Sequence, residues 1–420
     1  MERLLLLAHR IPYPPNKGDK IRSFNLLKFL SRHYHIHLGA YVDDPGDWPF
    51  MEDVRSYCTD SCLVGLDRTR SRARAVAGLI TGEALTPRYF RDPRLGRWVN
   101  RTLEEEGIRR VLAFSSPMAQ LVPAEKTSRV RMVTDFVDVD SDKWAQYGDR
   151  KGLLRGWIYR REARRLRDFE QQMATRSAAS VFVSRTEAEL FSRLVPEAAP
   201  RVTSVENGVD TAYFNPGLRF ASPYPKGVTP LVFTGAMDYW ANVDAVQWFA
   251  RYIFPRIHAR RPDTRFFVVG ARPTEAVRQL RNIQGVTVTG AVRDIRPYLA
   301  HACLAVAPMR VARGIQNKVL EAMAMARPVV ATDKALEGLE LPEDARLQAD
   351  DENSQVERVL ALLADDGGVG ECNREWARKR YAWERHMDRI AGLLEGQSDL
   401  GVGHIPKADL KEMLRAVRPA

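Results

Sequence analysis

A cation and a carboxylate three residues apart, Lys318 and Glu321, are the residues of this chain whose spacing best suits chemistry. Residues three apart share one face of a helix. The basic stretch 310–314 comes directly before them. A positive loop that leads into a helix N-terminus suits a phosphate, because free N–H groups and the helix dipole favour negative charge there. We therefore expect a nucleotide site, with Lys318 near the phosphates and Glu321 near the ribose hydroxyls.

The elements around this stretch predict one βαβ unit. Residues 304–307 form a short apolar run typical of a buried strand, and residues 315–325 are rich in strong helix formers. The helix must end before Pro328, after which residues 329–331 are again strand-like. The loop therefore lies at the carboxyl end of a parallel strand, which is where α/β proteins bind ligands.

Three further predicted strands of the C-terminal half each stop at a glycine, namely Gly235, Gly270 and Gly290. Glycine lets a ligand approach the backbone closely. Three such strand ends at the same edge of one parallel sheet indicate a nucleotide-binding face. We expect this face to continue into the loop before Lys318.

The N-terminal half opens with a predicted strand over 4–8, a long loop and a helix. Lys17, Gly18 and Lys20 place positive charge and a bare backbone at the start of that helix. The loop is either an anion site for a substrate phosphate or a solvated turn in which the glycine only bends the chain.

Two more strands of the N-terminal half are followed by polar residues. Ser116 comes just after the predicted strand 111–114, and Asp138 just after the predicted strand 132–136. Carboxylates at the carboxyl end of a strand are well placed to face a ligand. Asp138 is therefore a candidate catalytic or acceptor-binding carboxylate. The alternative is that this acidic stretch only caps the next helix.

Length and composition predict a globular protein of two domains. The chain has 420 residues, which is more than a single core usually organises. Of these residues 45% are hydrophobic and 28% charged, as is typical of a globular protein. Both halves show repeated βα units, so the expected fold class is α/β with two doubly wound parallel sheets. We expect the following segments: an N-terminal domain over 1–214, a Pro-rich linker over 215–230, a C-terminal domain over 231–379, a helix at about 380–395 that packs back on the first domain, and a tail over 398–420.

The formal net charge of +11 is compatible with nucleic acid, anionic lipid or phosphorylated substrates. No nucleic-acid reader module accompanies the charge, so nucleic acid is not expected as a partner. Residues 151–176 predict a basic helix with interleaved aromatics, which either lies on an anionic membrane surface or packs as an ordinary surface helix. The apolar runs are too short to span a bilayer, and the N-terminus shows no signal-peptide pattern. We therefore expect a cytoplasmic protein, peripheral on the inner face of the membrane if that helix binds lipid.

These motifs resemble those of the GT-B glycosyltransferases, and within them glycosyltransferase family 4 (group 1). The resemblance covers about residues 1–395. It rests on the Gly18 loop, the run Asn207-Gly208-Val209-Asp210, the three strand-end glycines and the run from Lys318 to Ala324. Within the family the chain looks most like the sugar transferases associated with exosortase and PEP-CTERM exopolysaccharide clusters, through residues 114–120, 138–144 and 313–318.

The resemblance implies two Rossmann-like domains facing a cleft. It also implies metal-independent transfer of a hexose from a nucleotide-sugar to a glycan or lipid-linked acceptor, with retained configuration, in exopolysaccharide biosynthesis. No cofactor and no metal site are expected. The residues implied to bind the donor are Gly235, Asn242, Gly270, Gly290, Val292, Arg313, Gly314, Ile315, Lys318 and Glu321. The residues implied to bind the acceptor are Lys17, Gly18, Lys20 and Ser116, and those implied in catalysis are Asp138, Arg313 and Lys318.

One position departs from the family pattern, which pairs two glutamates eight positions apart. Glu321 matches the second, which binds the nucleotide ribose, but Arg313 stands where the first, near the donor sugar, is expected. Arg313 and Lys318 would then neutralise the diphosphate. Two alternatives stay open: a nucleotide-sugar epimerase of the same fold, and a non-catalytic subunit that binds nucleotide or glycan.

Overall fold

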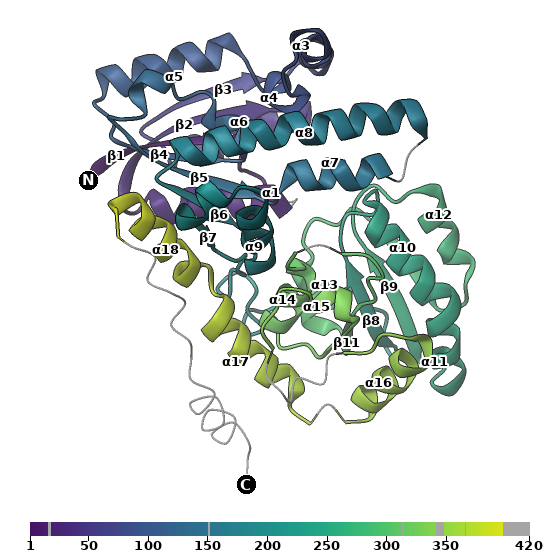
Figure 1. Ribbon diagram of the computed structural model, residues 1–420. Coiled ribbons are helices and arrows are strands. Elements are labelled where there is room, and N and C mark those ends of the chain that lie inside the picture. The colour runs from purple at the N-terminus through teal and green to yellow at the C-terminus, as the bar shows by residue number, and fades with distance from the viewer. Residues whose placement is uncertain (16–17, 150–151, 313, 342–347, 366, 398–420) are drawn as a thin grey trace. The chain divides into compact units, whose positions relative to one another are not determined.

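The computed structural model of the chain (Figure 1) falls into two compact units. Among the described residues, the first comprises Met1–Glu206 together with residues 386–397, and the second comprises Asn207–Arg385. The predicted tail over 398–420 lies outside the described residues. The residues that the structure describes are 1–15, 18–149, 152–312, 314–341, 348–365 and 367–397.

The first unit is built on a seven-stranded sheet with the strand order β3-β2-β1-β4-β5-β6-β7, in which all neighbours are parallel. Its interior strand β1 carries four fully buried leucines in succession, which is expected where helices cover both faces of a parallel sheet. The strands are β1 Glu2–Ala8, β2 Tyr34–Val42, β3 Asp60–Gly65, β4 Arg110–Phe114, β5 Arg131–Val137, β6 Ala179–Phe182 and β7 Val202–Ser204.

Helices α5, α6, α8 and α9 pack on one face of this sheet, where their apolar side chains join those of the strands in one core cluster. Figure 1 shows α5 and α8 lying across this face. The helices of the first unit are α1 Gly18–Leu30, α2 Met51–Arg55, α3 Arg68–Thr81, α4 Leu85–Tyr89, α5 Pro93–Glu105, α6 Ser116–Ala119, α7 Asp140–Asp149, α8 Leu153–Arg176 and α9 Arg185–Leu194. Helix α18, Trp383–Glu395, is tied to this unit at its end, where Tyr34 and Arg110 both contact the Glu395 carboxylate.

The second unit contains a five-stranded parallel sheet with the order β10-β9-β8-β11-β12. Its strands are β8 Thr229–Thr234, β9 Thr264–Val269, β10 Val286–Gly290, β11 Leu304–Ala307 and β12 Val329–Ala331. Its helices are α10 Trp240–Trp248, α11 Phe254–Arg260, α12 Glu275–Arg278, α13 Arg296–His301, α14 Asn317–Ala324, α15 Asp333–Leu336, α16 Glu352–Ala364 and α17 Val369–Tyr381. Both units are thus doubly wound parallel α/β structures, as predicted.

The helix after the basic loop begins at Asn317, two residues later than the sequence predicts. Gly314 has a positive φ of 64°, and Gln316 is in an extended conformation, so neither continues a helix toward the N-terminus. The strands on either side, β11 and β12, begin and end where they are predicted. The strand-loop-helix-strand unit is therefore confirmed.

The Pro-rich segment 215–230 packs on the second unit. Tyr224 is buried, its ring contacts those of Phe267 and Tyr298, and its hydroxyl donates to the Tyr298 carbonyl at 2.7 Å. The division between the units lies before this segment, at Glu206.

Candidate functional site

The strand order of the second unit places one switch point between β8 and β11. The chain runs from β8 to β9 and β10 on one side, and then returns to β11 and β12 on the other. The crevice outside the carboxyl ends of such a strand pair is the usual ligand site of an open α/β sheet. In this unit β8 leads into Gly235, and β11 leads into the loop 308–316. The residues that the sequence predicts to bind a nucleotide therefore flank the switch point.

Lys318 lies at this switch point and is held by three contacts. Its Nζ donates to Oδ1 of Asn242 at 2.7 Å, lies 3.7 Å from Sδ of Met309 and stands 4.9 Å from the centre of the Phe233 ring. Burial lowers the pKa of Lys318 to about 8, although the charge of Glu321 acts in the opposite direction. A phosphate beside this amine would restore the full positive charge.

Glu321 is the second chemical group of this helix. Burial raises the pKa of its carboxyl to about 7, against the effect of the Lys318 charge. Within the described part of the chain no hydrogen bond or ion pair holds this carboxylate. Its oxygens are therefore available to accept hydrogen bonds from a ligand diol. Because both pKa values are shifted toward 7, a larger fraction of Lys318 and of Glu321 is neutral near pH 7 than is usual for these residue types.

The perturbed pKa of Glu321 predicts a pH-dependent gain in stability on substitution by Gln. Because the folded-state pKa of about 7 lies above the ordinary 4.5, the stability that this carboxyl contributes is present below pH 4.5 and lost as the pH rises through 7. Glutamine does not ionise, so the Glu321→Gln variant does not lose this stability as the pH rises. The difference in unfolding free energy between variant and wild type should grow to about 1–3 kcal/mol from pH 4.5 to pH 7 and then stay constant. Urea unfolding at pH 5 and pH 8 measures it, and an equal difference at both values would contradict the prediction.

At two of the three strand-end glycines, close packing leaves little or no room for a side chain. A Cβ atom on Gly270 would lie 1.7 Å from the Gly235 carbonyl oxygen, and one on Gly235 would lie 2.8 Å from Nδ2 of Asn242. Gly290 differs, because its φ of 74° requires glycine while an added Cβ would meet no atom within 4 Å. Of the three, Gly290 thus leaves open space for a ligand. Val292, two residues further on, packs partly buried against the core.

The loop before α14 offers backbone donors. The side chain of the N-cap residue Gln316 makes no capping hydrogen bond, so the first N–H groups of the helix are not satisfied by that cap. Ile315 is buried and anchors the loop, whereas the exposed Arg310 is ion-paired with Asp244. Arg313 lies outside the described residues, and its role stays a prediction.

The first unit has its own switch point, between β1 and β4, and there the structure adds a residue that the sequence pattern did not single out. His9 directly follows β1, and its ring stacks on Phe114 with 5.6 Å between ring centres. Its Nε2 lies 3.2 Å from Oδ2 of Asp19, to which Arg10 also donates at 2.6 Å. Burial alone would raise the pKa of Asp19, but His9 and Arg10 together lower it strongly. The available signal was the position of His9 right after a buried strand.

Two strained residues mark the same edge of this sheet. Ser115 follows β4 with φ 76°, and Val137 ends β5 with φ 71°. A positive φ is costly for a β-branched residue, and such strain gathers at functional sites. The buried Asp135 holds both residues, because its carbonyl accepts from Ser115 N at 2.7 Å and its Oδ1 accepts from Val137 N at 3.1 Å.

Asp138 and Ser116 also lie at this edge, each one residue beyond a strained position. Ser116 is buried at the start of α6. Asp138 accepts from Nζ of Lys143 at 2.6 Å, and Asp140 contacts the same amine at 3.2 Å. Despite burial, the two aspartates raise the pKa of Lys143. The carboxylate of Asp138 is therefore held as part of an ion pair.

The predicted acceptor residues of the first loop take different positions. Gly18 begins α1, with open space where a Cβ would stand. Lys20 is buried, and its Nζ donates to Asp47 at 2.6 Å, so its charge is neutralised inside the unit. Lys17 lies outside the described residues. Gly18 is thus the accessible member of this group among the described residues.

A segment of the second unit matches a model of a known protein family. Residues 229–365 match the family model described as Glycosyl transferases group 1. This segment contains the three strand-end glycines, Lys318 and Glu321. No curated protein sequence matches the chain.

Solved structures of several proteins share the same fold over nearly the whole chain. Sucrose-phosphate synthase from Thermosynechococcus elongatus is 16% identical, with a TM-score of 0.67, over 94% of this chain and 99% of that one. WaaG, a glycosyltransferase involved in lipopolysaccharide biosynthesis, is 16% identical, with a TM-score of 0.62, over 94% and 100%. Anabaena Alr3699/HepE in complex with UDP and glucose is 13% identical, with a TM-score of 0.61, over 94% and 100%. These likenesses confirm the predicted GT-B fold, and the group 1 match supports the glycosyltransferase resemblance.

Proposed function

We propose that this protein is a glycosyltransferase that moves a sugar from a nucleotide-sugar to a glycan or lipid-linked acceptor. One observation carries the proposal: Lys318 and Glu321 meet at the switch point of a parallel sheet, inside the segment that matches the group 1 glycosyl transferases. The structures of Anabaena Alr3699/HepE hold UDP and UDP-glucose. A UDP-sugar is therefore the first donor to test.

In the proposed donor complex the nucleotide lies along the carboxyl edge of the second sheet. The base lies against the backbone near Gly290 and Val292, and the ribose diol donates to Glu321. The diphosphate accepts from Lys318 and from the N–H groups at the start of α14, and Arg313 is proposed to assist. As the sugar–phosphate bond breaks, negative charge grows on the leaving phosphate. Fixed positive groups stabilise that charge most, because they need no reorganisation during the reaction.

We propose that the acceptor binds at the carboxyl edge of the first sheet. Gly18, Ser116 and Asp138 are the predicted contacts, and His9 joins them because it lies at the same switch point. The resemblance further leads us to propose family 4 membership, hexose transfer without a metal ion, retained anomeric configuration and a role in exopolysaccharide synthesis. Proton NMR of the product tests retention, because the coupling constant of the anomeric proton reports the configuration of the new bond. A configuration opposite to that of the donor sugar would exclude retention.

A screen and a product assay distinguish the proposed function from its alternatives. Thermal shift with UDP-, GDP- and TDP-sugars identifies the donor, because a ligand that binds the native state raises the melting temperature. The stabilising nucleotide-sugar is then incubated with and without a glycan acceptor. Acceptor-dependent release of the nucleoside diphosphate supports transfer. Isomerised nucleotide-sugar without acceptor would indicate an epimerase, and binding without turnover would indicate a non-catalytic subunit.

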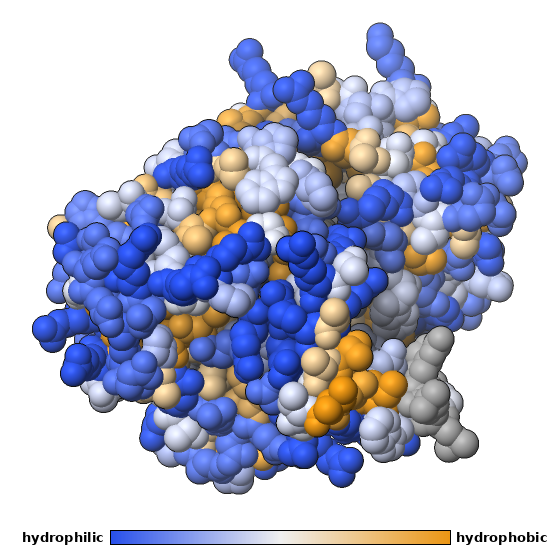
Figure 2. Space-filling view, turned by 90° about the horizontal axis from the view of Figure 1, so that it is seen from above, coloured by the Kyte–Doolittle hydropathy of each residue, from blue (hydrophilic) through white to orange (hydrophobic). Residues whose placement is uncertain are grey.

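We propose that the protein associates with an anionic membrane surface. None of the described helices is long and apolar enough to cross a bilayer. Helix α3 nevertheless exposes Val76 by 59% and Ile80 by 91%, and it also exposes the arginines Arg70 and Arg72. Figure 2 shows small apolar areas enclosed by broad hydrophilic ones on the face seen from above. A helix that exposes both apolar side chains and arginines suits the interface of an anionic bilayer.

Exchange of both apolar side chains for glutamate is expected to weaken this association. The double variant Val76→Glu, Ile80→Glu removes apolar contact and adds repulsion from anionic lipid, so flotation with phosphatidylglycerol vesicles should fall at least tenfold. The matched control Val311→Glu places the same change on an exposed valine of the second unit. Equal flotation of the double variant and the control would contradict a role for α3.

A further inference from the structure

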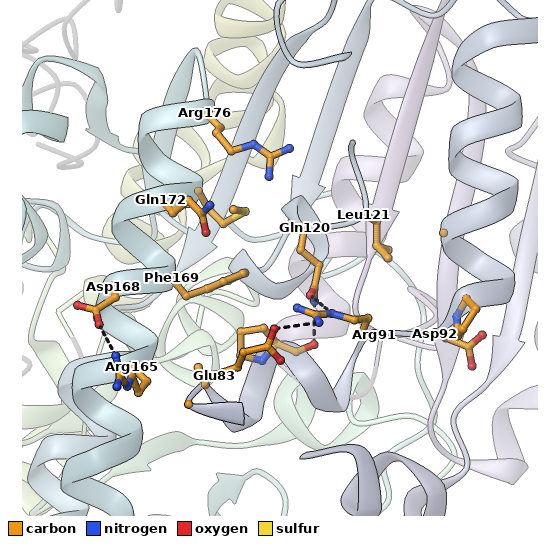
Figure 3. A pocket seen from close by; sticks show the side chains of 16 residues that line it. Glu83, Arg91, Asp92, Gln120, Leu121, Arg165, Asp168, Phe169, Gln172 and Arg176 are labelled. Carbon is orange, nitrogen blue, oxygen red and sulfur yellow. Dashed lines mark hydrogen bonds and ion pairs between the residues drawn. The ribbon is translucent and has the colours of Figure 1, made fainter. Parts of the chain in front are cut away.

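The first unit contains a cavity of about 570 Å³ on the face of its sheet that α5 and α8 cover. The crossover from β4 to β5 contains the four-residue helix α6 and the short 3-10 helix Ala124–Lys126, where a longer helix would normally fill the layer. Helices α5 and α8 therefore face each other across a hollow (Figure 3). A volume of this size is typical of small-molecule sites.

The cavity has an apolar floor. Leu121 and Met173 are buried at its base, and Phe169 extends from α8 toward the opposite wall (Figure 3). Pro87 and Pro93 complete this apolar lining. An alkyl chain or a ring would bury apolar surface at this floor without displacing a polar group.

The charged side chains around the cavity leave one cation uncompensated. Arg91 is paired with Glu83 at 3.2 Å, and Arg165 with Asp168 at 3.8 Å. Arg176 has no ion pair within the described residues. It donates to the Val122 carbonyl and to Thr127, while its Nε is buried without a partner.

Burial lowers the pKa of Arg176, and the charge of Glu125 only partly offsets this effect. A half-buried guanidinium of this kind is stabilised by any anion that reaches it.

The walls of the cavity are fixed by hydrogen bonds between helices. The Glu162 carboxylate on α8 accepts from the N–H groups of Leu85 at 2.7 Å and Thr86 at 2.9 Å, which holds the start of α4. Arg161 donates to the Gly78 carbonyl at 2.7 Å, which holds the end of α3. The hollow is therefore formed before any ligand arrives.

We propose that this cavity binds an amphipathic anion, with its phosphate or carboxylate at Arg176 and its apolar chain over Leu121, Phe169 and Met173. The cavity lies under α4, α5 and α8, and none of its lining residues is among those proposed for donor or acceptor. The inference therefore goes beyond transfer and does not depend on it. The ligand is either a free amphiphile or the headgroup and chain of an anionic lipid, which share this chemistry.

Gly96 provides a variant that fills the cavity without harming the fold. It lies in α5 and lines the cavity, and an added Cβ would meet no atom within 4 Å. Gly96→Leu also replaces a poor helix former by a good one, so the variant should fold at least as well as the wild type. Asn100→Leu is the matched control, because it adds the same side chain one turn further along α5, at a position that does not line the cavity.

The test is calorimetric titration of the full chain with monomeric decyl phosphate, with decanol and inorganic phosphate as partial ligands. We expect decyl phosphate to bind at least tenfold more tightly than either partial ligand. Gly96→Leu and Arg176→Gln should each weaken it at least tenfold, and Asn100→Leu should not. Unchanged affinity in Gly96→Leu, or equal affinity for decanol, would overturn the proposal. The Gly96 variant keeps the test decisive even if Arg176→Gln unfolds.

A second arm distinguishes the two sources of the ligand. Flotation with phosphatidylglycerol vesicles that falls in Gly96→Leu supports a lipid as the occupant, and decyl phosphate binding without such a fall supports a free amphiphile. Vesicle binding that persists in Gly96→Leu, together with no binding of decyl phosphate, would assign the interaction to surface arginines and overturn the cavity site.

Discussion

Replacing Lys318 by methionine is expected to lower the turnover number for sugar transfer by about 100- to 1,000-fold. Loss of one fixed donor to a developing negative charge costs about 2.7–4 kcal/mol of transition-state stabilisation. Methionine keeps the length of the side chain and its contact with Phe233, so the loss reports charge more than packing. The measurement is turnover with the donor identified by the thermal screen, together with calorimetry of the free nucleoside diphosphate. Turnover should fall much more than affinity.

A proton count provides a second readout for Lys318. With a pKa of about 8 in the ligand-free protein, part of the amine is neutral at pH 8.5, and a bound diphosphate should draw a proton onto it. Binding measured in two buffers of different ionisation enthalpy should therefore show proton uptake, which Lys318→Met abolishes. Arg310→Met is the matched control, because Arg310 lies on the same loop but is already paired with Asp244. A fully active Lys318→Met enzyme would assign charge neutralisation to another cation.

The position of the candidate nucleotide site in the second unit could be predicted from sequence because its determinants are local. The three-residue spacing of Lys318 and Glu321, the helix before Pro328 and the buried strand before the loop all lie within about one βαβ unit. Local spacing fixes which side chains share a helix face, and parallel strands bring their carboxyl ends to one edge. The strand order then places this edge at a switch point.

The first loop shows what local reasoning misses. Lys20 and Arg22 are basic residues at the start of a helix, which suggests a surface anion site. Their partners, Asp47 and Asp135, lie 27 and 113 residues away in the sequence. Such distant pairs convert two apparent binding charges into buried ion pairs, and nothing in the local pattern indicates it.

Backbone strain at the first sheet was equally hidden from the sequence. Valine is a favoured strand residue, so Val137 reads as an ordinary strand end. Its positive φ occurs together with a hydrogen bond from its N–H to the Asp135 side chain, two residues before it, and with a register shift in the pairing of β5 with β6. The glycines Gly235 and Gly270 show the converse. The pattern suggested room for a ligand, but a Cβ on Gly270 would meet the Gly235 carbonyl, and one on Gly235 would meet the Asn242 side chain.

Replacing Glu321 by alanine is expected to weaken nucleoside diphosphate binding about 10- to 100-fold while the fold persists. A hydrogen bond to a charged group contributes about 1.5–3 kcal/mol, and each 1.4 kcal/mol is a factor of ten in affinity. The fold should persist because the carboxylate holds no hydrogen bond or ion pair within the described residues, and its removal takes a partly enclosed charge out of the unit. Calorimetry measures the affinity, and the melting temperature reports the fold.

The pH dependence of binding separates a carboxylate that accepts from the ribose from one that only fills space. A diol donates to the ionised form, so binding should favour ionisation of Glu321 and release protons near pH 6, below its pKa of about 7. Affinity should therefore fall as the pH drops below 7, and again above 8 as Lys318 loses its proton. Glu321→Ala should lose the acid limb and keep the alkaline one. Glu357→Ala, which removes a surface carboxylate paired with Arg260 in the same unit, should keep both limbs. The nucleotide-sugar is the ligand for this measurement, because its esterified diphosphate lacks the second phosphate pKa of about 6 of a free nucleoside diphosphate. Proton release that survives in Glu321→Ala would then show that another group accepts from the nucleotide.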